Sequence, residues 1–536
     1  MFHDLSPRDN FVSRFVASAR CRPDAPALDD YGVSSLTYGD LMAGIGKLLA
    51  LWRLAGLKRG DRVALNARSC ANWAKVFLAA QIGGYVSVQI FKGFTGCDTL
   101  GLVNHCGARI LYTEKAVFSK MDFAGMPALM AAVDLVTVEL LASRDGFGEV
   151  FSRKDSLPLA DTDNVTTDLD VLSAIMYTSG STGNPKGVML TNRNLSANLY
   201  AIERHFPFRM GESYLSVLPF SHIFGMVYDM LAPLCLGMHL VILGAPPVPA
   251  NLIPALQKHR PHIFFSVPLI LEKLIGAVIG DDLQSGKRLP WEELSQKFIS
   301  ALGGNLELLV SGGAAINENL EKLLVDELKV PFVTGYGMTE AAPTISLGHY
   351  GDYVRHECGK VVEEIVELKI DSADGAGIPG EILIKGPAVF TGYYRNPEAT
   401  AKAFTLDGWF RTGDVATLED GGRVFIVGRC KNMILGPSGQ NIFPEEIEVI
   451  LNELPYVAES IVVDRNGKAF AIIVPDSDEV AQNNISSQTL HGIMKKNITH
   501  LNSRIPAYAT VSGFRLRYEP FAKTPKGTIK RFMYSE

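Results

Sequence analysis

A segment rich in glycine and hydroxyl side chains surrounds one lysine in the first half of the chain. It comprises Thr178, Ser179, Gly180, Ser181, Thr182 and Gly183, followed by Lys186. Glycines permit tight turns and close approach of a ligand, and hydroxyl, backbone N–H and ammonium groups can all donate to phosphate oxygens. A Walker loop ends in Gly-Lys-Ser/Thr, whereas here Pro185 precedes the lysine and Gly187 follows it. We therefore predict a polyphosphate cradle unlike that of P-loop kinases; a plain surface turn is the alternative.

Two further segments could hold a flat nucleotide base. Residues 306–310 and 330–334 read as strands, and each runs into a glycine turn, Ser311-Gly312-Gly313 and Gly335-Tyr336-Gly337. In open α/β sheets, ligands bind beyond the carboxyl ends of the strands. Both turns are therefore expected at a nucleotide site, with Tyr336 as an ordinary core residue being the alternative.

Two carboxylates have types and positions that suit the same ligand. Glu340 alone would repel a polyphosphate, but a bridging Mg²⁺ resolves this, because Mg²⁺ prefers one or two carboxylates plus phosphate oxygens. Asp414 follows a glycine and could accept hydrogen bonds from two ribose hydroxyls. The alternatives are a solvated glutamate and a turn aspartate.

These segments carry a resemblance to a known family. Tyr177-Thr178-Ser179-Gly180-Ser181-Thr182-Gly183-x-Pro185-Lys186-Gly187 resembles the signature loop of the AMP-forming adenylating superfamily, which includes acyl-CoA synthetases, firefly luciferase and peptide-synthetase adenylation domains. Further matches follow in the family's order at residues 218–222, 311–314, 335–340, 409–414 and 428–432. The resemblance spans roughly residues 35–531.

The resemblance implies a role for individual residues. It implies nucleotide contacts from the phosphate loop and from a second set: Gly313, Ala314, Ala315, Gly335, Tyr336, Gly337, Met338, Thr339, Asp414 and Arg429. Tyr336 would stack on adenine, Thr339 would contact phosphate, and Thr182 and Glu340 would hold Mg²⁺. Lys431 falls on the family's hinge position.

The acyl and thiol side is implied by fewer residues. His222 would gate the acyl site beside Val227, although a structural core histidine is the alternative. Gly439 and Gln440 belong to a segment resembling the loop that lines the thiol's approach, with a surface turn as the alternative.

The activity implied is two-step acid–thiol ligation. ATP and a carboxylic acid give acyl-AMP and pyrophosphate, and the acyl group then passes to coenzyme A as co-substrate. Apolar Val227, Leu231 and Leu234, with a likeness to long-chain fatty acid–CoA ligases at residues 266–274, predict a medium- or long-chain fatty acid. An acyl-AMP or acyl-carrier-protein ligase is one alternative, and a weakly catalytic nucleotide-binding protein is another.

One position departs from the family. Its adenylation lysine falls on Thr528, while Lys526 and Lys530 flank that position. Lys526, if it lies in a loop, could take the place of the family's adenylation lysine. Lys530 could take that place if the segment is extended, because residues two apart then share a face. The third possibility is that no lysine serves.

The elements that position these residues indicate an α/β fold. Alternating helical and strand patterns, such as the capping box Thr37-x-x-Asp40 before a helix and the strand at 62–65, predict layered α/β subdomains. Short consecutive strands at 381–385 and 423–427 predict a small β-barrel-like part, about 345–429. A helix from Pro444 and a hairpin at Asn466-Gly467 predict a small α+β C-terminal domain, and the resemblance implies that this domain is mobile. The expected domains are 1–429, which binds AMP, and 430–536.

Composition limits the class of protein. The 536 residues carry a net charge of −6, which gives no general attraction for nucleic acid. Seven scattered cysteines without a CxxC pair argue for a reducing cytoplasm and against a zinc site. The N-terminus lacks the pattern of a signal peptide. Prolines interrupt the most apolar stretch, 231–250, so we expect buried strand and loop there and at most peripheral, loose membrane contact. The oligomeric state is left undecided.

Overall fold

The structure is a computed structural model that describes residues 2–144, 146–162, 165–178, 185–284, 289–372, 378–436, 440–523 and 529–534. The chain separates into two units. Unit 1 comprises Met1–Ile316, Lys322–Glu367 and Lys385–Phe404, and unit 2 comprises Asn317–Glu321, Leu368–Ile384 and Thr405–Glu536. The predicted fold class, a large α/β N-terminal part followed by a small C-terminal domain, is confirmed. The domain boundary at 429/430 stays a prediction.

The largest sheet of unit 1 carries the predicted phosphate loop. Its eight strands have the order β19-β9-β8-β4-β3-β5-β6-β7, with bounds Gly392–Tyr393, Lys186–Thr191, Leu172–Thr178, Val86–Gln89, Arg62–Asn66, Ile110–Thr113, Ala131–Asp134 and Leu140–Ser143. The five strands β8 to β6 are parallel, and β9 returns antiparallel to β8. Strands β4 and β5 are buried at every residue, as expected of parallel strands covered on both faces. The strand predicted at 62–65 is confirmed.

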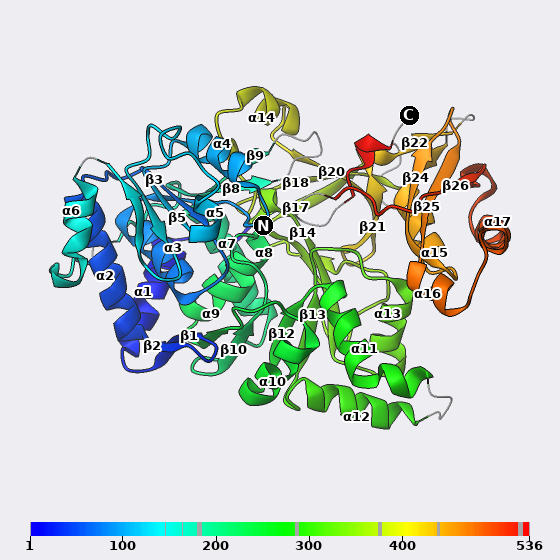
Figure 1. The fold of residues 1–536 in the computed structure, drawn as a ribbon, viewed down its shortest axis with the longest axis horizontal. Coiled ribbons are helices and arrows are strands. Elements are labelled where there is room, and N and C mark those ends of the chain that lie inside the picture. The colour runs from blue at the N-terminus through cyan, green and yellow to red at the C-terminus, as the bar shows by residue number, and fades with distance from the viewer. Residues whose placement is uncertain are drawn as a thin grey trace. The chain divides into compact units, whose positions relative to one another are not determined.

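Helices of unit 1 follow these strands. The capping box predicted at Thr37 and Asp40 begins α2 (Tyr38–Leu54): the N–H of Thr37 donates to the Asp40 carboxylate, and the N–H of Asp40 donates to the Thr37 hydroxyl. Helices α1 and α3 pack against α2 (Figure 1). The remaining helices of this part are η1 (Pro7–Asp9), α1 (Phe11–Cys21), α3 (Ala71–Gly83), α4 (Gly96–Cys106), α5 (Lys115–Phe118), α6 (Phe147–Ser152), η2 (Lys154–Ser156), α7 (Asn192–His205) and α14 (Pro397–Ala403).

Two further groups of strands complete unit 1. One is the four-stranded sheet β10-β11-β1-β2 (Ser213–Ser216, His239–Ile242, Pro26–Asp30, Ser34–Thr37). The other runs β12-β13-β14-β15-β16 (Ile263–Ser266, Leu308–Ser311, Phe332–Gly337, Thr344–Leu347, Lys360–Val361). Between them in the chain lie α8 (Ile223–Met226), η3 (Val227–Leu231), α9 (Ala232–Cys235), α10 (Pro249–His259), α11 (Pro268–Gln284) and α12 (Trp291–Ala301). The stretch 231–250 therefore holds the expected strand, but also a short helix that the sequence analysis did not predict.

The turn predicted at Gly335-Tyr336-Gly337 is wrong. These residues continue β14 and pair antiparallel with β15, with Tyr336 opposite Ser346. The glycine at 337 serves a close approach, because a Cβ there would lie 2.2 Å from the carbonyl oxygen of Pro343. A side chain at this position would push the two strands apart.

Unit 2 contains the predicted run of consecutive strands. Its order is β21-β20-β18-β17 (Arg423–Arg429, Phe410–Glu419, Gly380–Lys385, Glu367–Asp371). Strand β20 is antiparallel to both neighbours. The strands predicted at 381–385 and 423–427 are thus confirmed. Unit 2 also takes most of helix α13 (Glu318–Lys322). The segment of unit 1 that follows α13 contains the π-helical turn η4 (Leu323–Glu327) and the turn η5 (Thr339–Ala341).

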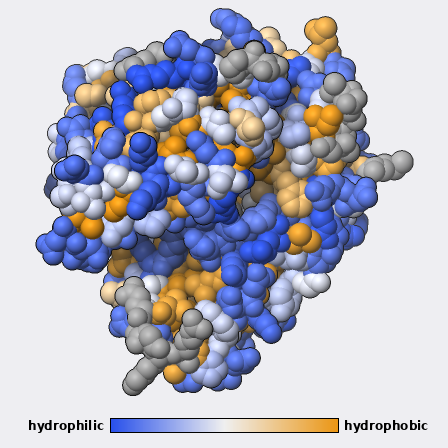
Figure 2. Space-filling view, turned by 90° about the vertical axis from the view of Figure 1, so that its right-hand side faces the viewer, coloured by the Kyte–Doolittle hydropathy of each residue, from blue (hydrophilic) through white to orange (hydrophobic). Residues whose placement is uncertain are grey.

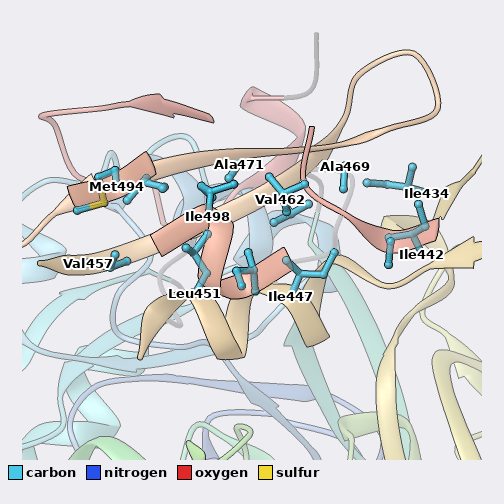
Figure 3. Close-up of a cluster of buried hydrophobic side chains, with 14 of the residues drawn as sticks. Ile434, Ile442, Ile447, Leu451, Val457, Val462, Ala469, Ala471, Met494 and Ile498 are labelled. Carbon is cyan, nitrogen blue, oxygen red and sulfur yellow. The ribbon is translucent and has the colours of Figure 1, made fainter. Parts of the chain in front are cut away.

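The C-terminal part of unit 2 forms a compact α+β arrangement. The helix predicted from Pro444 is α15 (Pro444–Asn452), and the hairpin predicted at Asn466-Gly467 joins β24 (Val457–Asp464) to β25 (Ala469–Pro475). Ile447 and Leu451 of α15 pack onto the inner face of this hairpin with Met494 of α17 (Ser487–Arg504) (Figure 3). The other elements are η6 (Cys430–Asn432), β22 (Ile434–Leu435), β23 (Asn441–Ile442), α16 (Ser477–Gln482), η7 (Ala507–Ala509), β26 (Phe514–Leu516) and η8 (Arg531–Met533).

Neither the surface drawn in Figure 2 nor the described helices have the continuous apolar character that a bilayer requires. On the face drawn in Figure 2, hydrophobic residues lie in separate groups among hydrophilic ones. Within the described ranges, none of the helices combines the length and the apolar composition needed to cross a bilayer.

Candidate functional site

The stems of the predicted phosphate loop are neighbouring antiparallel strands. Strand β8 ends at Thr178 and β9 begins at Lys186, and these two residues are paired across the strands. The Thr178 hydroxyl lies 3.5 Å from the Lys186 carbonyl oxygen. The predicted contacts from Ser179, Gly180, Ser181, Thr182 and Gly183 lie outside the described residues. The structure therefore places both ends of the loop and the lysine.

Tyr393 joins the lysine to the predicted metal-binding glutamate. The Lys186 ammonium lies 4.8 Å from the centroid of the Tyr393 ring, within reach of a cation–π contact. The Tyr393 hydroxyl donates a hydrogen bond of 3.0 Å to Oε1 of Glu340. Burial, and then the charge of Glu340, raise the pKa of Tyr393 well above its usual value. Three segments far apart in sequence thus meet at one point.

Glu340 suits a magnesium ion that is shared with a polyphosphate. Its side chain belongs to η5 and is 9% exposed, and its backbone carbonyl accepts a hydrogen bond from the N–H of Phe390. Among the described residues, no group of three or more His, Cys, Asp or Glu could hold a metal ion. A lone buried carboxylate fits Mg²⁺, which keeps water and phosphate oxygens as its other ligands. Thr182, the other predicted ligand, is not described.

The predicted adenine site lies at the carboxyl ends of parallel strands. Strands β12, β13 and β14 are parallel, with Ser266, Ser311 and Thr334 in register. Directly after β13, the residues Gly313, Ala314 and Ala315 are exposed. Gly335 and Tyr336, half-buried, and Gly337, exposed, continue β14 beyond Thr334, followed by Met338 and the buried Thr339. Both segments therefore extend from the same edge of the sheet, where ligands of open α/β sheets bind.

The predicted acyl-site histidine caps a short helix. The Nδ1 atom of His222 accepts a hydrogen bond of 3.3 Å from the N–H of Phe224, at the start of α8. The Phe224 ring lies beside Gly312, where an added Cβ would come within 3.3 Å of it. Val227 is 1% exposed at the start of η3. The geometry gives His222 a structural role and leaves its gating role a prediction.

The sequence analysis missed a buried carboxylate, Asp229, in the helical turn η3 that directly follows α8. Asp229 of η3 accepts hydrogen bonds from the hydroxyls of Tyr214 and Ser216 and from the N–H groups of Val217 and Leu218. Burial is the main reason that the pKa of Asp229 is raised to about 6. Asp229 thereby ties the strand before the His222 segment to the helix after it.

Asp414 and Arg429 of unit 2, two residues predicted to contact the nucleotide, lie next to each other. They are opposite each other on β20 and β21, and Arg429 Nε lies 2.8 Å from Asp414 Oδ1. Asp414 is 4% exposed, whereas half of the Arg429 side chain is exposed. The pair gives a fixed carboxylate with a positive group beside it, which suits ribose hydroxyls and phosphate.

The remaining predicted residues of unit 2 are placed in part. Lys431 lies in η6, where burial and then the charge of Arg429 lower its pKa. Gln440 is exposed, and its carbonyl accepts a hydrogen bond from the N–H of Gly436. Lys530 directly precedes η8. Gly439 and Lys526 lie outside the described residues.

Comparison with known proteins defines the class. A model of the AMP-binding enzyme family matches residues 15–394, and a model of the AMP-binding enzyme C-terminal domain matches residues 431–536. The chain therefore belongs to the AMP-binding enzyme family.

Individual relatives are CoA ligases by name. A feruloyl-CoA synthase from Amycolatopsis sp is 31% identical over 84% of this chain and 84% of its own. The long-chain-fatty-acid–CoA ligase FadD15 from Mycobacterium bovis is 27% identical over 76% of this chain and 72% of its own. The ATP-bound structure of MatB from Rhodopseudomonas palustris has the same fold, with a TM-score of 0.80 at 22% identity over 99% of this chain and 98% of its own.

Proposed function

We propose that this protein is an AMP-forming acid–CoA ligase that uses ATP, Mg²⁺ and coenzyme A. The observation that carries the proposal is the arrangement of Lys186, Tyr393 and Glu340 at the stem of the phosphate loop. In this arrangement Tyr393 contacts both the Lys186 ammonium, which could bind phosphate oxygens, and the Glu340 carboxylate, which could bind a metal ion. Its relatives named as CoA ligases support the choice of acceptor.

The chemistry proceeds by two substitutions. A carboxylate oxygen of the acid attacks the α-phosphorus of ATP, the bond to the β-phosphate oxygen breaks, and pyrophosphate leaves. The sulfur of coenzyme A then attacks the acyl carbonyl carbon, and AMP leaves. Both reactants of the first step are anions, so Lys186 and the loop donors must offset developing negative charge. Mg²⁺, when bound, would neutralise polyphosphate charge at Glu340.

We propose a medium- or long-chain fatty acid as the substrate. The segment after His222 supports an apolar acid, because Val227, Leu231 and Leu234 are all at most 1% exposed. A second candidate, an aryl acid of the feruloyl type, is favoured by aromatic packing at the same place. Phe224 lies 5.3 Å from Tyr228, and Tyr228 lies 4.9 Å from Phe265, between ring centroids.

A panel of acids tests the proposal. Purified protein with ATP, Mg²⁺ and coenzyme A should release AMP and consume thiol with octanoate, palmitate, 4-coumarate or ferulate. Glu340→Gln should lower the rate by about 100-fold or more, since it removes the carboxylate proposed to hold Mg²⁺, the cation that offsets the negative charge of the polyphosphate. Pyrophosphate exchange that is faster with amino acids than with these acids would contradict the proposal. Acyl transfer to a carrier protein without transfer to coenzyme A would mean that the acceptor of the acyl group is a carrier protein and not coenzyme A.

The place of action is also part of the proposal. The seven cysteines are free thiols, which supports a reducing, cytoplasmic setting, with at most loose contact to membranes.

A further inference from the structure

Tyr393 contacts two side chains of opposite charge at once. Its ring takes the Lys186 ammonium at 4.8 Å, and its hydroxyl donates to Glu340 Oε1 at 3.0 Å. Tyr393 as a whole residue is 8% exposed. In a buried setting both contacts are stronger than they would be in water. Each of the two charged groups is therefore biased toward one position before any ligand arrives.

The backbone around Tyr393 is held by several separate interactions. Strand β19 pairs with β9, so that Tyr393 is opposite Val188, two residues from Lys186. The N–H of Tyr393 donates to the hydroxyl of Thr400, and the N–H of Tyr394 donates to the carbonyl of Gly187. Gly392 fits closely against Thr400, since a Cβ would lie 2.7 Å from its Cγ2 atom. The tyrosine is thus fixed to the strand that carries the lysine.

A second aromatic contact fixes the ring itself. The ring of Phe390 lies 4.9 Å from that of Tyr393, edge to face, and the N–H of Phe390 donates to the Glu340 carbonyl. The segment 390–393 therefore holds Glu340 by its backbone and by its side chain.

We propose that Tyr393 is a positioning residue of the adenylation step, which sets the Lys186 cation and the Glu340 carboxylate at a fixed spacing for magnesium-bound polyphosphate. This inference rests on the proposed function. A carboxylate has about four lone-pair sites, so the hydroxyl can remain on Oε1 while the carboxylate binds a metal ion. Preorganised charges cost no rearrangement when the reaction occurs.

Tyr393→Phe is the sharpest test, because it removes the hydroxyl and keeps the ring. The affinity for α,β-methylene-ATP, measured by calorimetry with Mg²⁺, should fall about tenfold, as expected for loss of a hydrogen bond to a charged group. The affinity for AMP, which lacks the β- and γ-phosphates, should change less than about twofold. Transfer of a preformed acyl-AMP to coenzyme A should also be unchanged.

Tyr394→Phe is the matched control. The Tyr394 hydroxyl lies 3.5 Å from the Cys106 carbonyl, and its backbone contact to Gly187 does not need the side chain. This variant should bind the magnesium–nucleotide analogue like the wild type.

Each outcome separates the inference from the proposed function. If Tyr393→Phe lost equal affinity for α,β-methylene-ATP and for AMP, the defect would be a general structural one, and the positioning role would be overturned. Unchanged affinity of Tyr393→Phe for the analogue would also overturn it. A wild type that adenylates no acid but binds the analogue would refute the proposed function alone. Tyr393→Leu should cost more than Tyr393→Phe, because it also removes the ring that faces Lys186.

Discussion

At the scale of single residues, Asp229 couples the acyl-site helix to the preceding strand through a charge that is costly to bury. Its carboxylate accepts four hydrogen bonds, two of them from the backbone N–H groups of Val217 and Leu218. The pKa is nevertheless raised, because burial outweighs these donors. The four hydrogen bonds thus offset part, but not all, of the free-energy cost of burying the ionised Asp229 carboxylate.

The titration of Asp229 predicts a pH dependence of stability. Between its usual pKa of 3.8 and about 6, the folded protein holds a proton that the unfolded chain has lost. The free energy of unfolding should therefore fall as pH rises through this window. Asp229→Asn removes this titration but turns an NH₂ group toward N–H donors, so it should destabilise the fold by about 1–3 kcal/mol or more.

Urea unfolding of both proteins between about pH 4 and pH 7 checks this prediction. The wild-type curve minus the variant curve should slope downward with rising pH, and other groups that titrate cancel in the difference. Asp40 lies at an exposed capping box whose hydrogen bonds lower its pKa. The wild-type curve minus the Asp40→Asn curve should therefore slope upward with rising pH, in a window at and below the usual pKa of 3.8. Parallel curves for the wild type and Asp229→Asn would refute the role of burial.

At the scale of elements, the backbone around Lys530 bears on which lysine could serve adenylation. Lys523 and Ile529 are bridged, and the N–H of Lys530 donates to the carbonyl of Ala522. Arg531, the next residue, contacts the buried carboxylate of Glu448 and the carbonyl of Val462. The backbone of Lys530 is therefore attached to the body of the domain, whereas Lys526 and Thr528 lie outside the described residues.

We expect Lys526 to be the substitute lysine. Lys526→Ala should lower pyrophosphate exchange by about tenfold or more, and Lys530→Ala should lower it less, because a lysine contributes charge stabilisation only when it reaches the reacting phosphate. Thr528→Lys should raise the rate of pyrophosphate exchange only slightly. A large gain in Thr528→Lys would instead indicate an impaired site, and the reverse order of losses would assign the role to Lys530.

The sequence predicted local patterns well and long-range contacts poorly. The helix at Thr37, the strand at 62–65 and the hairpin at Asn466 depend on neighbouring residues, and all three are confirmed. The contact between Tyr393 and Glu340 depends on the pairing of β19 with β9, which no local pattern reveals. The turn at Gly337 was wrong for the same reason, since the glycine serves the approach of β15.

At the scale of the whole molecule, the C-terminal part has a hydrophobic core of its own. One face of the hairpin β24–β25 packs Val462, Ala471 and Ile473 against α15 and α17 (Figure 3). The other face packs Ile461 and Ile472 against Phe521 and Tyr534 in a separate cluster. Alternate residues of the strands thus serve two cores, and both lie within residues 434–534.

This arrangement predicts that a fragment of residues 430–536 folds without the rest of the chain. A domain of about 100 residues can bury enough apolar surface to be stable. The fragment should unfold in one cooperative transition with dispersed amide signals by NMR. Leu451→Ala, which truncates a side chain that is 0% exposed in this core, should destabilise it by about 2–5 kcal/mol. Val449→Ala, on the exposed side of the same helix, should change it little. A fragment that stays unfolded, but folds when it is extended upstream to include β20 and β21, would move the boundary from 429/430 to before Phe410.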